Sequence, residues 1–457
     1  MNSNIYIKRT KIRASVEKAF QWHTKNGAIS RLTPPWAPLK MISRSSDGIK
    51  KGVNVKFRLK IFKIPMIWEA EHIDYQENKL FQDHQIKGPF GKWVHTHRFK
   101  ADGEKAFIME DHIEFKLPFG FLSWPFTGFA RKEFNRMFEY RHRVLKHDLE
   151  NYVGKTKRKR ILISGASGTI GGALVPFLET CGHEVLRLVR KKENLSKGEI
   201  FWDPYKGLLD LEKVGAVDVL INLNGVDISR GRWTEEQRKK IIDSRVIPTR
   251  FLVEKFKEMD KKPSIFISSS AIGFYGDRDD EILKEDISDG ECFISKVCKE
   301  WEEPSVEAQD LGIRTVQLRI GVVLTPAGGA LARMALPFKA GFGVTLSHGK
   351  QYMSWISMDD AIAGILHIIY NDDIKGAVNL TAPNPVTNKE FSKTLAKVFN
   401  RRVFFNIPKF VAHILWGEMG KETLLASTRV EPEKLIANGF VFQHTTLLQA
   451  LKDLLGR

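Results

Sequence analysis

The chain has 457 residues and a hydrophobic content of 42%, which together predict a globular protein of two or three domains with separate cores. Its three cysteines, Cys181, Cys292 and Cys298, form no CxxC pair, which excludes a disulfide framework and a cysteine zinc site and favours a reducing cytoplasm. The net charge is +18, and residues 1–157, with 30 Lys and Arg against 16 Asp and Glu, carry +14 of it.

The N-terminal segment lacks the apolar core of a signal peptide, and no uncharged apolar run reaches the roughly 20 residues that a membrane-spanning helix needs. We therefore expect a cytoplasmic protein. The basic first third is compatible with anionic ligands, a membrane surface or nucleic acid. Because the chain carries no named nucleic-acid motif, a solvated basic surface is favoured and no nucleic-acid partner is expected.

Residues 1–154 read as an α+β domain. Alternating residues around Tyr6–Ile12 predict a first strand, and Ser15 precedes a short helix over Val16–His23. Strand-like segments separated by glycines follow and favour antiparallel hairpins. They are Met41–Ser45, Val53–Phe62, Met66–Tyr75, Lys79–Ile86, Lys92–Lys100 and Ala106–Lys116. Apolar residues at a spacing of three to four predict a long closing helix from about Ala130 to Tyr152.

This order of elements resembles the SRPBCC (START-like) helix-grip fold, in which a curved sheet wraps the last helix around a cavity for an apolar ligand. The phrases GPFGKWVHTHRF (Gly88–Phe99) and DHIEFKLPFG (Asp111–Gly120) are similar to those of SRPBCC domains fused to reductases. The resemblance spans the whole segment and implies a ligand-binding domain over residues 1–154, without a catalytic signature.

One face of the strand Lys92–Lys100 should present Trp93, His95, His97 and Phe99, because side chains alternate along a strand. A His-x-His pair can bind a metal. Without a nearby carboxylate or a third ligand of evident spacing, no metal is expected here. Polar groups that line a ligand cavity, or a plain solvent face, are favoured. The aromatic residues available to line such a cavity are Trp93, Phe99, Phe115 and Trp124.

The segment Leu117–Ala130, LPFGFLSWPFTGFA, carries no charged residue and is rich in aromatic side chains. It is interpreted as a lid over the cavity. The alternative is a portal that contacts apolar surfaces, which with the +14 charge leaves peripheral contact with an anionic membrane open as a hypothesis.

The short basic linker Gly154–Lys159 precedes a second predicted domain over residues 158–457. Its opening stretch, Arg160–Arg190, reads as strand, glycine-rich turn, helix and strand. Gly165, Gly168 and Gly171 form GxxGxxG, in which the first glycine allows the turn, the second a close approach of phosphate, and the third helix–strand packing. The N–H groups of the following helix would face a pyrophosphate. This context predicts a Rossmann-type parallel sheet that binds a dinucleotide.

The end of the second strand indicates which dinucleotide binds. Glu184 has the spacing of an acidic ribose ligand, but it lies where the chain enters the strand. The residue that leaves the strand is Arg190, followed by Lys191 and Lys192. A guanidinium at this position suits a 2′-phosphate, so NADP(H) is favoured over NAD(H), with a solvated basic turn as the alternative.

Further elements follow in the order of an α/β domain. Ile200–Trp202 and Val217–Asn222 read as strands, and Leu223-Asn224-Gly225 would pass the ribose on the adenine side. Thr234 is expected to cap a helix over Glu235–Phe256 that carries Arg245. Two more buried strands are predicted over Ser264–Ser270 and Thr315–Val323.

This second domain resembles the extended short-chain dehydrogenase/reductases, and within them an atypical, NAD-dependent epimerase-like subgroup. The matching phrases are SSSAIGFYGD (Ser268–Asp277), LRIGVVLTPAGGAL (Leu318–Leu331), MSWISMDDAIAGI (Met353–Ile365) and NLTAPNPVTNKEF (Asn379–Phe391). Residues 400–457 are similar to the C-terminal extension of that subgroup. The cofactor contacts that the resemblance implies are Gly165, Ser167, Gly168, Thr169, Ile170, Val189, Arg190, Leu223, Asn224, Arg245 and Val323.

The chain departs from that superfamily at its catalytic Tyr-x-x-x-Lys pair, in which the lysine lowers the pKa of a tyrosine that acts as general acid or base. The aligned positions hold Ile294 and Cys298, which cannot do this work. Ser270 keeps the serine position, and Tyr275 is the nearest phenol in sequence, with packing of its ring as the alternative. The predicted catalytic residues are therefore Ser270 and Tyr275.

Together these features predict an NADP(H)-dependent oxidoreductase or epimerase-like enzyme that acts on a small, partly apolar substrate and is fused to an apolar-ligand domain. The alternative is a non-enzymatic NADP(H)-binding sensor, because the usual proton donor is missing.

Overall fold

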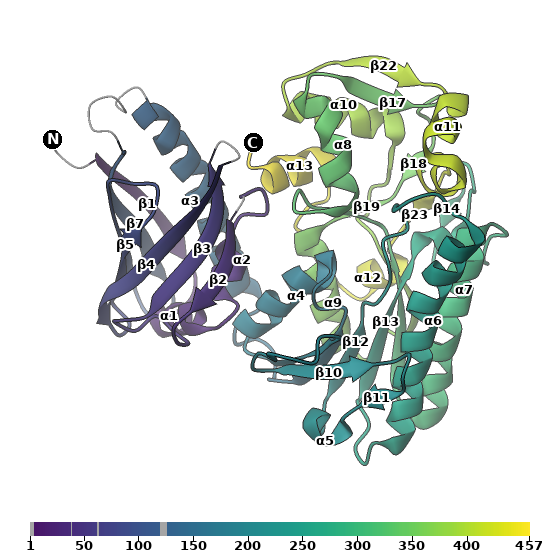
Figure 1. Cartoon of the computed structure of the whole chain (residues 1–457), viewed down its shortest axis with the longest axis horizontal. Helices are drawn as coiled ribbons and strands as arrows, with labels where there is room; N and C mark the ends of the chain where they lie inside the picture. The colour runs from purple at the N-terminus through teal and green to yellow at the C-terminus, as the bar shows by residue number, and fades with distance from the viewer. Residues whose placement is uncertain (1–3, 38, 62–63, 119–125) are drawn as a thin grey trace. The chain divides into compact units, whose positions relative to one another are not determined.

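The computed structural model describes residues 4–37, 39–61, 64–118 and 126–457. The chain divides into two compact units (Figure 1). The first contains Met1–Arg158 with Pro176–His183 and Gly456, and the second contains Lys159–Val175, Glu184–Leu455 and Arg457. Each unit has its own hydrophobic cores and is described by itself.

The first unit contains one antiparallel sheet of seven strands in the order β1-β7-β6-β5-β4-β3-β2. Their bounds are β1 Asn4–Ile12, β2 Leu39–Arg44, β3 Asn54–Ile61, β4 Ile64–Gln76, β5 Leu80–Lys87, β6 Lys92–Ala101 and β7 Phe107–Lys116. The helices are α1 Val16–Thr24, α2 Ala28–Leu32 and α3 Thr127–Asn151. The structure therefore has an antiparallel sheet with a long closing helix, as the sequence predicts. Helix α2, with five residues, was not predicted.

The long helix α3 supplies one wall of the first unit's core (Figure 1). Phe138, Val144 and Leu145 are at most 2% exposed because they recur on one stripe of the helix, facing buried residues of the sheet. At the end of this stripe, Arg31 of α2 donates to both carboxylate oxygens of Asp148, each at 3.0 Å. This buried bidentate pair fixes α2 against α3 and leaves neither charge without a partner.

The second unit is built on an eight-stranded sheet in the order β11-β10-β9-β8-β12-β13-β15-β20, parallel except for β11. The bounds are β8 Arg160–Ser164, β9 Glu184–Val189, β10 Glu199–Asp203, β11 Leu208–Leu209, β12 Val219–Asn222, β13 Ile265–Ala271, β15 Arg314–Ile320 and β20 Gly376–Leu380. The strands β9 and β10 lie on one side of β8, and β12 lies on its other side, so the strand order reverses at β8. In parallel α/β sheets, a ligand crevice lies at such a reversal of strand order.

Helices cover both faces of this sheet, with α6 and α7 on one side and α4 and α9 on the other (Figure 1). The helices of eight or more residues are α4 Thr169–Thr180, α6 Glu235–Glu258, α7 Phe293–Glu307, α8 Gly329–Lys339, α9 Met358–Tyr370, α10 Asn388–Val398, α11 Lys409–Met419 and α13 Leu447–Leu455. Shorter ones are α5 Leu211–Val214 and α12 Glu433–Ala437. Thr234 accepts from the Gln237 N–H and caps α6, as predicted. Among the described residues, no helix combines the length and the apolar character needed to cross a bilayer.

Small two-stranded sheets complete the C-terminal part. They pair β14 Ile282–Leu283 with β23 Arg429–Val430, β16 Val322–Leu324 with β19 Trp355–Ser357, β17 Gly343–Leu346 with β22 Val403–Ile407, and β18 Tyr352–Met353 with β21 Val386–Thr387. The predicted strand Thr315–Val323 is therefore wrong at its end. The chain leaves the main sheet at Gly321, where a Cβ would lie 2.8 Å from the Ser354 carbonyl oxygen, and Val323 belongs to the separate strand β16.

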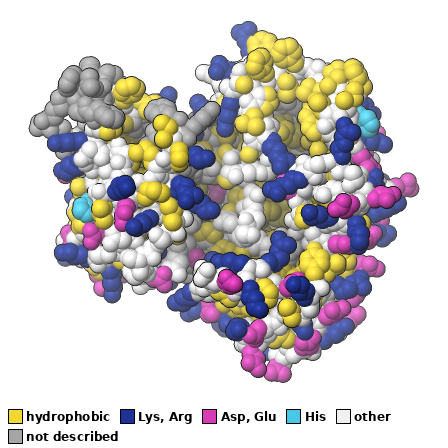
Figure 2. Space-filling view, in the orientation of Figure 1, with side chains coloured by type: hydrophobic (Ala, Val, Ile, Leu, Met, Phe, Trp, Pro, Cys, Tyr) yellow, Lys and Arg dark blue, Asp and Glu magenta, His cyan; other side chains and the backbone are white. Residues whose placement is uncertain are grey.

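Hydrophobic side chains gather on the surface of the C-terminal part over β22 and α11 (Figure 2). Phe404 and Phe405 on β22 are 65% and 55% exposed, and Phe410, Ile414 and Leu415 on α11 are at least 57% exposed. A group of exposed large apolar residues is typical of a surface that contacts another molecule.

Candidate functional site: the cleft at the strand reversal

A cleft of about 800 Å³ opens at the carboxyl ends of β8, β9 and β12, where the strand order reverses. Seven of the eleven predicted cofactor residues line it. They are Gly165, Ser167, Gly168, Val189, Arg190, Leu223 and Asn224. The remaining lining residues come mainly from β10 and its following turn and from one face of α6. They include Lys191, Glu199, Tyr205, Lys239, Lys240 and Asp243.

The glycine-rich turn is packed so tightly that only glycine fits at two of its positions. Gly165 has φ +75°, and a Cβ on it would lie 2.4 Å from the Leu223 carbonyl oxygen. A Cβ on Gly171 would lie 2.4 Å from the Gly165 carbonyl oxygen. Ser167 and Gly168 are exposed just before α4, and the Gly168 N–H closes the turn by donating to the Gly165 carbonyl oxygen at 3.0 Å. Such a turn at a helix N-terminus suits a pyrophosphate.

The loop after β12 is held in place by a buried hydrogen-bond network. Ser164 Oγ donates to Asn222 Oδ1 at 2.9 Å, and Asn224 Nδ2 donates to Ser164 Oγ at 2.7 Å. Asn222 in turn donates to Thr249 Oγ1 on α6 at 2.8 Å. The carboxyl ends of β8 and β12 are therefore tied together and to α6, and Leu223 and Asn224 form one wall of the cleft.

Arg190 lies at the carboxyl end of β9, at the rim of this cleft. Its side chain is exposed, and among the described residues it has neither a hydrogen bond nor a salt bridge. Two of the three lysines that line the cleft are paired, Lys191 with Glu199 at 3.0 Å and Lys239 with Asp243 at 2.8 Å. Arg190 is thus a guanidinium that stays available for an anion, and its planar fork suits a phosphate.

Four predicted cofactor residues do not line the cleft. Thr169 and Ile170 lie in the first turn of α4, beside the glycine-rich turn, and Val323 lies in β16. Arg245 is only 9% exposed, and its guanidinium donates to the Val226 carbonyl at 3.1 Å. It also stacks on Trp301 at 4.9 Å. Arg245 therefore holds the loop after β12 through its hydrogen bond to Val226, and its guanidinium does not line the cleft.

The two predicted catalytic residues are also absent from the cleft lining. Ser270 is 2% exposed, and its Oγ donates to Glu302 Oε1 at 2.6 Å. Tyr275 is fully buried, donates to Asn379 Oδ1 at 2.7 Å and accepts from Arg319 at 3.1 Å. Burial raises the pKa of the Tyr275 phenol. Both hydroxyls are engaged in the interior, and their catalytic role stays a prediction.

The positions aligned with the superfamily's catalytic pair are filled by core residues. Ile294 is 5% exposed and packs against Gly273, where an added Cβ would meet its side chain at 3.1 Å. Cys298 is 1% exposed, and burial raises the pKa of its thiol to about 12. A thiol with such a pKa stays protonated and unreactive near neutral pH.

The first unit contains a second candidate site, a cavity of about 140 Å³. His95 and His97 face into it, as the alternation along β6 predicts, and Trp93 lines it with them. Phe99 and Phe115 are buried in the hydrophobic core and do not line it. Trp124 and half of the predicted lid, residues 119–125, lie outside the described residues.

Carboxylates accompany these histidines, so the prediction that none lies nearby is wrong. Asp83 pairs with His95 across β5 and β6, and Asp111 pairs with His97 across β6 and β7. Burial lowers the pKa of His97 to about 4. Burial alone would raise the pKa of Asp111, but the neighbouring histidines hold it well below its usual range. At neutral pH we therefore expect His97 to be neutral and Asp111 to be ionised.

The strand order, the glycine-rich turn and the phosphate-suited rim together define a Rossmann-type dinucleotide-binding protein. Residues 161–381 match the NAD dependent epimerase/dehydratase family, and residues 407–454 match a domain of unknown function, DUF1731. An epimerase family protein of Mycobacterium bovis is 38% identical over 291 residues, which cover 64% of this chain and 96% of that protein. The chain belongs to this epimerase family, whose nucleotide cofactor is NAD(P).

Two solved structures extend this comparison. A nucleoside-diphosphate sugar epimerase from Corynebacterium glutamicum has a TM-score of 0.80 at 30% identity, over 99% of this chain and 90% of that one. Human epimerase family protein SDR39U1, crystallised with NADPH, has a TM-score of 0.59 at 30% identity, over 65% of this chain and 98% of that one. The first of these similarities includes the N-terminal antiparallel domain.

Proposed function

We propose that this chain is an NADP(H)-dependent oxidoreductase or epimerase-like enzyme that acts on a small, partly apolar substrate. The observation that carries the cofactor preference is Arg190, an exposed guanidinium without a salt bridge among the described residues, at the strand end where a 2′-phosphate would lie. The NADPH in the human relative's crystal structure supports this choice.

Different residues of the chain would bind different parts of the cofactor. The turn Gly165–Gly168 and the first N–H groups of α4 would hold the pyrophosphate. Arg190 would hold the 2′-phosphate, and Leu223 and Asn224 would lie along the ribose on the adenine side. When bound, the nicotinamide supplies the hydride chemistry, while the protein supplies orientation and electrostatics.

For the first unit we propose the helix-grip SRPBCC fold and a small ligand in its cavity. A sheet closed by α3 around a cavity lined mainly by apolar residues supports this assignment. Its volume of about 140 Å³ is below the roughly 300–1,000 Å³ of drug-sized pockets, so the ligand must be small. Peripheral contact with an anionic membrane stays a separate hypothesis, and flotation of the full chain with anionic and neutral vesicles tests it.

The cofactor preference is tested by fluorescence titration of NADPH and NADH with Arg190→Ala. A lost guanidinium–phosphate contact of about 1.5–3 kcal/mol should weaken NADPH binding roughly tenfold or more. NADH binding should barely change. Lys192→Ala is the matched control, because Lys192 is an exposed neighbour that does not line the cleft. Unchanged NADPH affinity in Arg190→Ala, or a wild type that prefers NADH, would show that the assignment is wrong.

A non-enzymatic NADP(H)-binding sensor is the second candidate function. It is favoured by Ile294 and Cys298, two buried core residues at the positions of the usual proton-donor pair. Intact NADPH binding without turnover of carbonyl, carbinol or nucleotide-sugar substrates would favour the sensor. Steady NADPH oxidation or sugar epimerisation by the full chain would favour the enzyme.

A further inference from the structure

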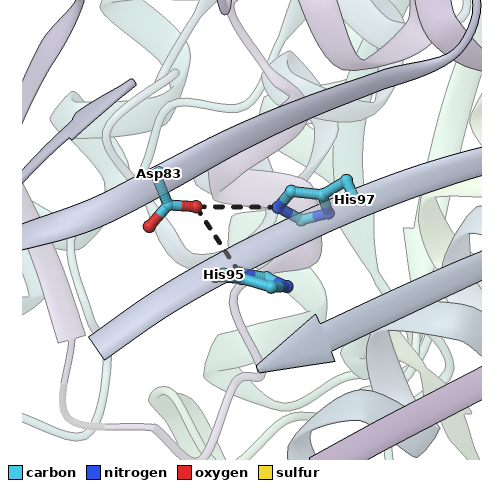
Figure 3. Close-up of side chains that lie close together, drawn as sticks. All are labelled: Asp83, His95 and His97. Atoms are coloured by element: carbon cyan, nitrogen blue, oxygen red, sulfur yellow. Dashed lines mark ion pairs between the residues drawn. The ribbon is translucent and has the colours of Figure 1, made fainter. Parts of the chain in front are cut away.

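The cavity of the first unit contains two imidazoles and a carboxylate that converge on one point (Figure 3). His95 Nδ1 lies 3.5 Å and His97 Nε2 lies 3.8 Å from Asp83 Oδ2. The ligand atoms offered by the three residues all lie within 4.8 Å of one another. With metal bonds of about 2.1 Å, atoms at the corners of a tetrahedron lie about 3.4 Å apart. The two nitrogen–oxygen distances, 3.5 and 3.8 Å, are close to that value.

The strand register explains why these side chains meet. Asp83 and His95 are directly opposed on β5 and β6, and His97 follows His95 on the same face of β6. Two histidines separated by one residue therefore point the same way, and a carboxylate from the next strand faces them. Rigid neighbouring strands can hold such a set with little rearrangement on binding.

A second carboxylate, Asp111, hydrogen-bonds the far side of the His95 ring and contacts the far side of the His97 ring. Asp111 Oδ1 lies 2.9 Å from His95 Nε2 and 2.6 Å from His97 Nδ1. Asp111 Oδ2 is 2.6 Å from His142 Nε2, so a further ring anchors it. A carboxylate behind a histidine is the usual outer partner of a metal-bound imidazole, since it fixes the ring's orientation and leaves the other nitrogen free to bind.

The remaining cavity lining gives a separate indication of a polar occupant. His72 lines the same cavity at 7% exposure, and its Nδ1 has no hydrogen-bond partner among the described residues. Buried polar atoms are usually hydrogen-bonded, so this nitrogen is open to a polar occupant of the cavity. Arg141 also lines the cavity, together with Asp83, and Asp111 lies behind the two histidines, so two carboxylates accompany one guanidinium.

We propose that Asp83, His95 and His97 form a binding site for a divalent transition-metal ion, with the open coordination position facing the apolar cavity. Two imidazoles and one carboxylate are ligands that Zn²⁺ and Fe²⁺ share, whereas Mg²⁺ and Ca²⁺ prefer oxygen. The site is distinct from the dinucleotide cleft, since the two share no residue. A small ligand of the cavity would then bind partly through the metal.

The test is metal binding by the purified full chain. The protein is stripped with a chelator, reloaded with Zn²⁺, Fe²⁺ or Co²⁺ and desalted, and its metal content is measured. We expect one ion per chain, and Co²⁺ should give visible absorption bands typical of four- or five-fold coordination. Failure of the wild-type chain to retain any of the three ions near one equivalent would overturn the proposal.

Variants locate the ion. Asp83→Asn and His97→Gln should each weaken Co²⁺ binding at least about tenfold and remove or shift the absorption bands. His84→Gln is the matched control, because His84 neighbours Asp83 on β5 and its side chain is 38% exposed, outside the cavity lining. Equal loss in the control, or retained bands in both site variants, would place the ion elsewhere. Circular dichroism and NADPH titration check that each variant is folded.

Discussion

Tyr275 donates its phenolic proton to Asn379 Oδ1 at 2.7 Å, across 104 positions of sequence. The phenolic oxygen of Tyr275 in turn accepts from Arg319, which is held by two 3.0 Å hydrogen bonds to Glu302. Glu302 also accepts from Ser270. The two predicted catalytic hydroxyls therefore belong to one buried network that joins β13, α7, β15 and β20, and this network leaves neither proton free.

The first prediction is that Tyr275→Phe lowers the free energy of unfolding by about 1–3 kcal/mol, because it leaves a buried amide oxygen and a guanidinium N–H without a partner. The ring still fills its place in the core, so NADPH binding should be unchanged. Urea unfolding and cofactor titration measure the two effects. Tyr205→Phe is the control for the unfolding measurement alone, since Tyr205 is 51% exposed and its change should cost little stability, whereas its place in the cleft lining excludes it as a control for cofactor binding.

Ser270→Ala should behave in the same way, since it removes a hydrogen bond to a buried carboxylate. A loss of turnover in Tyr275→Phe or Ser270→Ala without any loss of stability would contradict this interpretation. Such a result would support the catalytic role that the sequence predicts for the Ser270 and Tyr275 hydroxyls.

Local sequence patterns predicted most of the fold. The strands of the first unit were placed within a few residues because side-chain alternation and glycine positions are local signals. Gly165 and Gly171 were assigned their packing roles from spacing alone, and both sit where a Cβ would collide with backbone. Helix α2 was missed because five residues are too few to show a helical period.

The interior positions of functional residues could not be read from local patterns. Val323 continues an apolar run, but the chain turns out of the sheet at Gly321, a change that depends on the distant Ser354. Asp83 lies 12 residues before His95, and only the pairing register of β5 and β6 makes them neighbours. The burial of Arg245 and Tyr275 likewise depends on residues far along the chain.

The second prediction compares two adjacent glycines of α4. An added Cβ on Gly171 would lie 2.4 Å from the Gly165 carbonyl oxygen and 2.7 Å from Ala166 Cα. Since both contacts are backbone atoms, Gly171→Ala must displace the glycine-rich turn. We expect a loss of about 1–3 kcal/mol in stability, by analogy with overpacked cores, together with weaker NADPH binding.

Gly172→Ala is the matched control in the same helix. Its Cβ would meet only the Ala166 carbonyl oxygen at 4.0 Å, and the residue is exposed. The substitution should raise stability by up to about 1 kcal/mol, because alanine favours a helix interior over glycine. Thermal unfolding of the two variants measures the loss of stability in Gly171→Ala and the gain in Gly172→Ala. NADPH titration measures the effect of each on cofactor binding. Equal effects of the two substitutions would show that the turn is not packed as described.

The last prediction concerns His444, which is fully buried in the C-terminal part. Its Nε2 lies 3.0 Å from Asp453 Oδ2, and its Nδ1 lies 3.0 Å from Ser357 Oγ and 3.5 Å from Asp360. Burial opposes its charge, but the two carboxylates outweigh burial and raise the pKa of His444 to about 9. At neutral pH the ring is therefore charged and paired.

A folded-state pKa above the unfolded value of about 6.5 means that protonation stabilises the fold. This contribution, about 3 kcal/mol from the shift, should be fully present below pH 6.5 and should be lost as the pH rises through about 9. Urea unfolding of the wild type and of His444→Gln at a series of pH values measures this contribution as the difference between their free energies of unfolding. The difference should decrease between pH 6.5 and about 9. The other titrating groups are common to both proteins, so their effects cancel in the difference. Asp453→Asn, which removes one partner, should shift the window to lower pH. An NMR titration midpoint of the His444 ring near 6.5 would contradict the assignment, since it would mean that burial and the two carboxylates cancel.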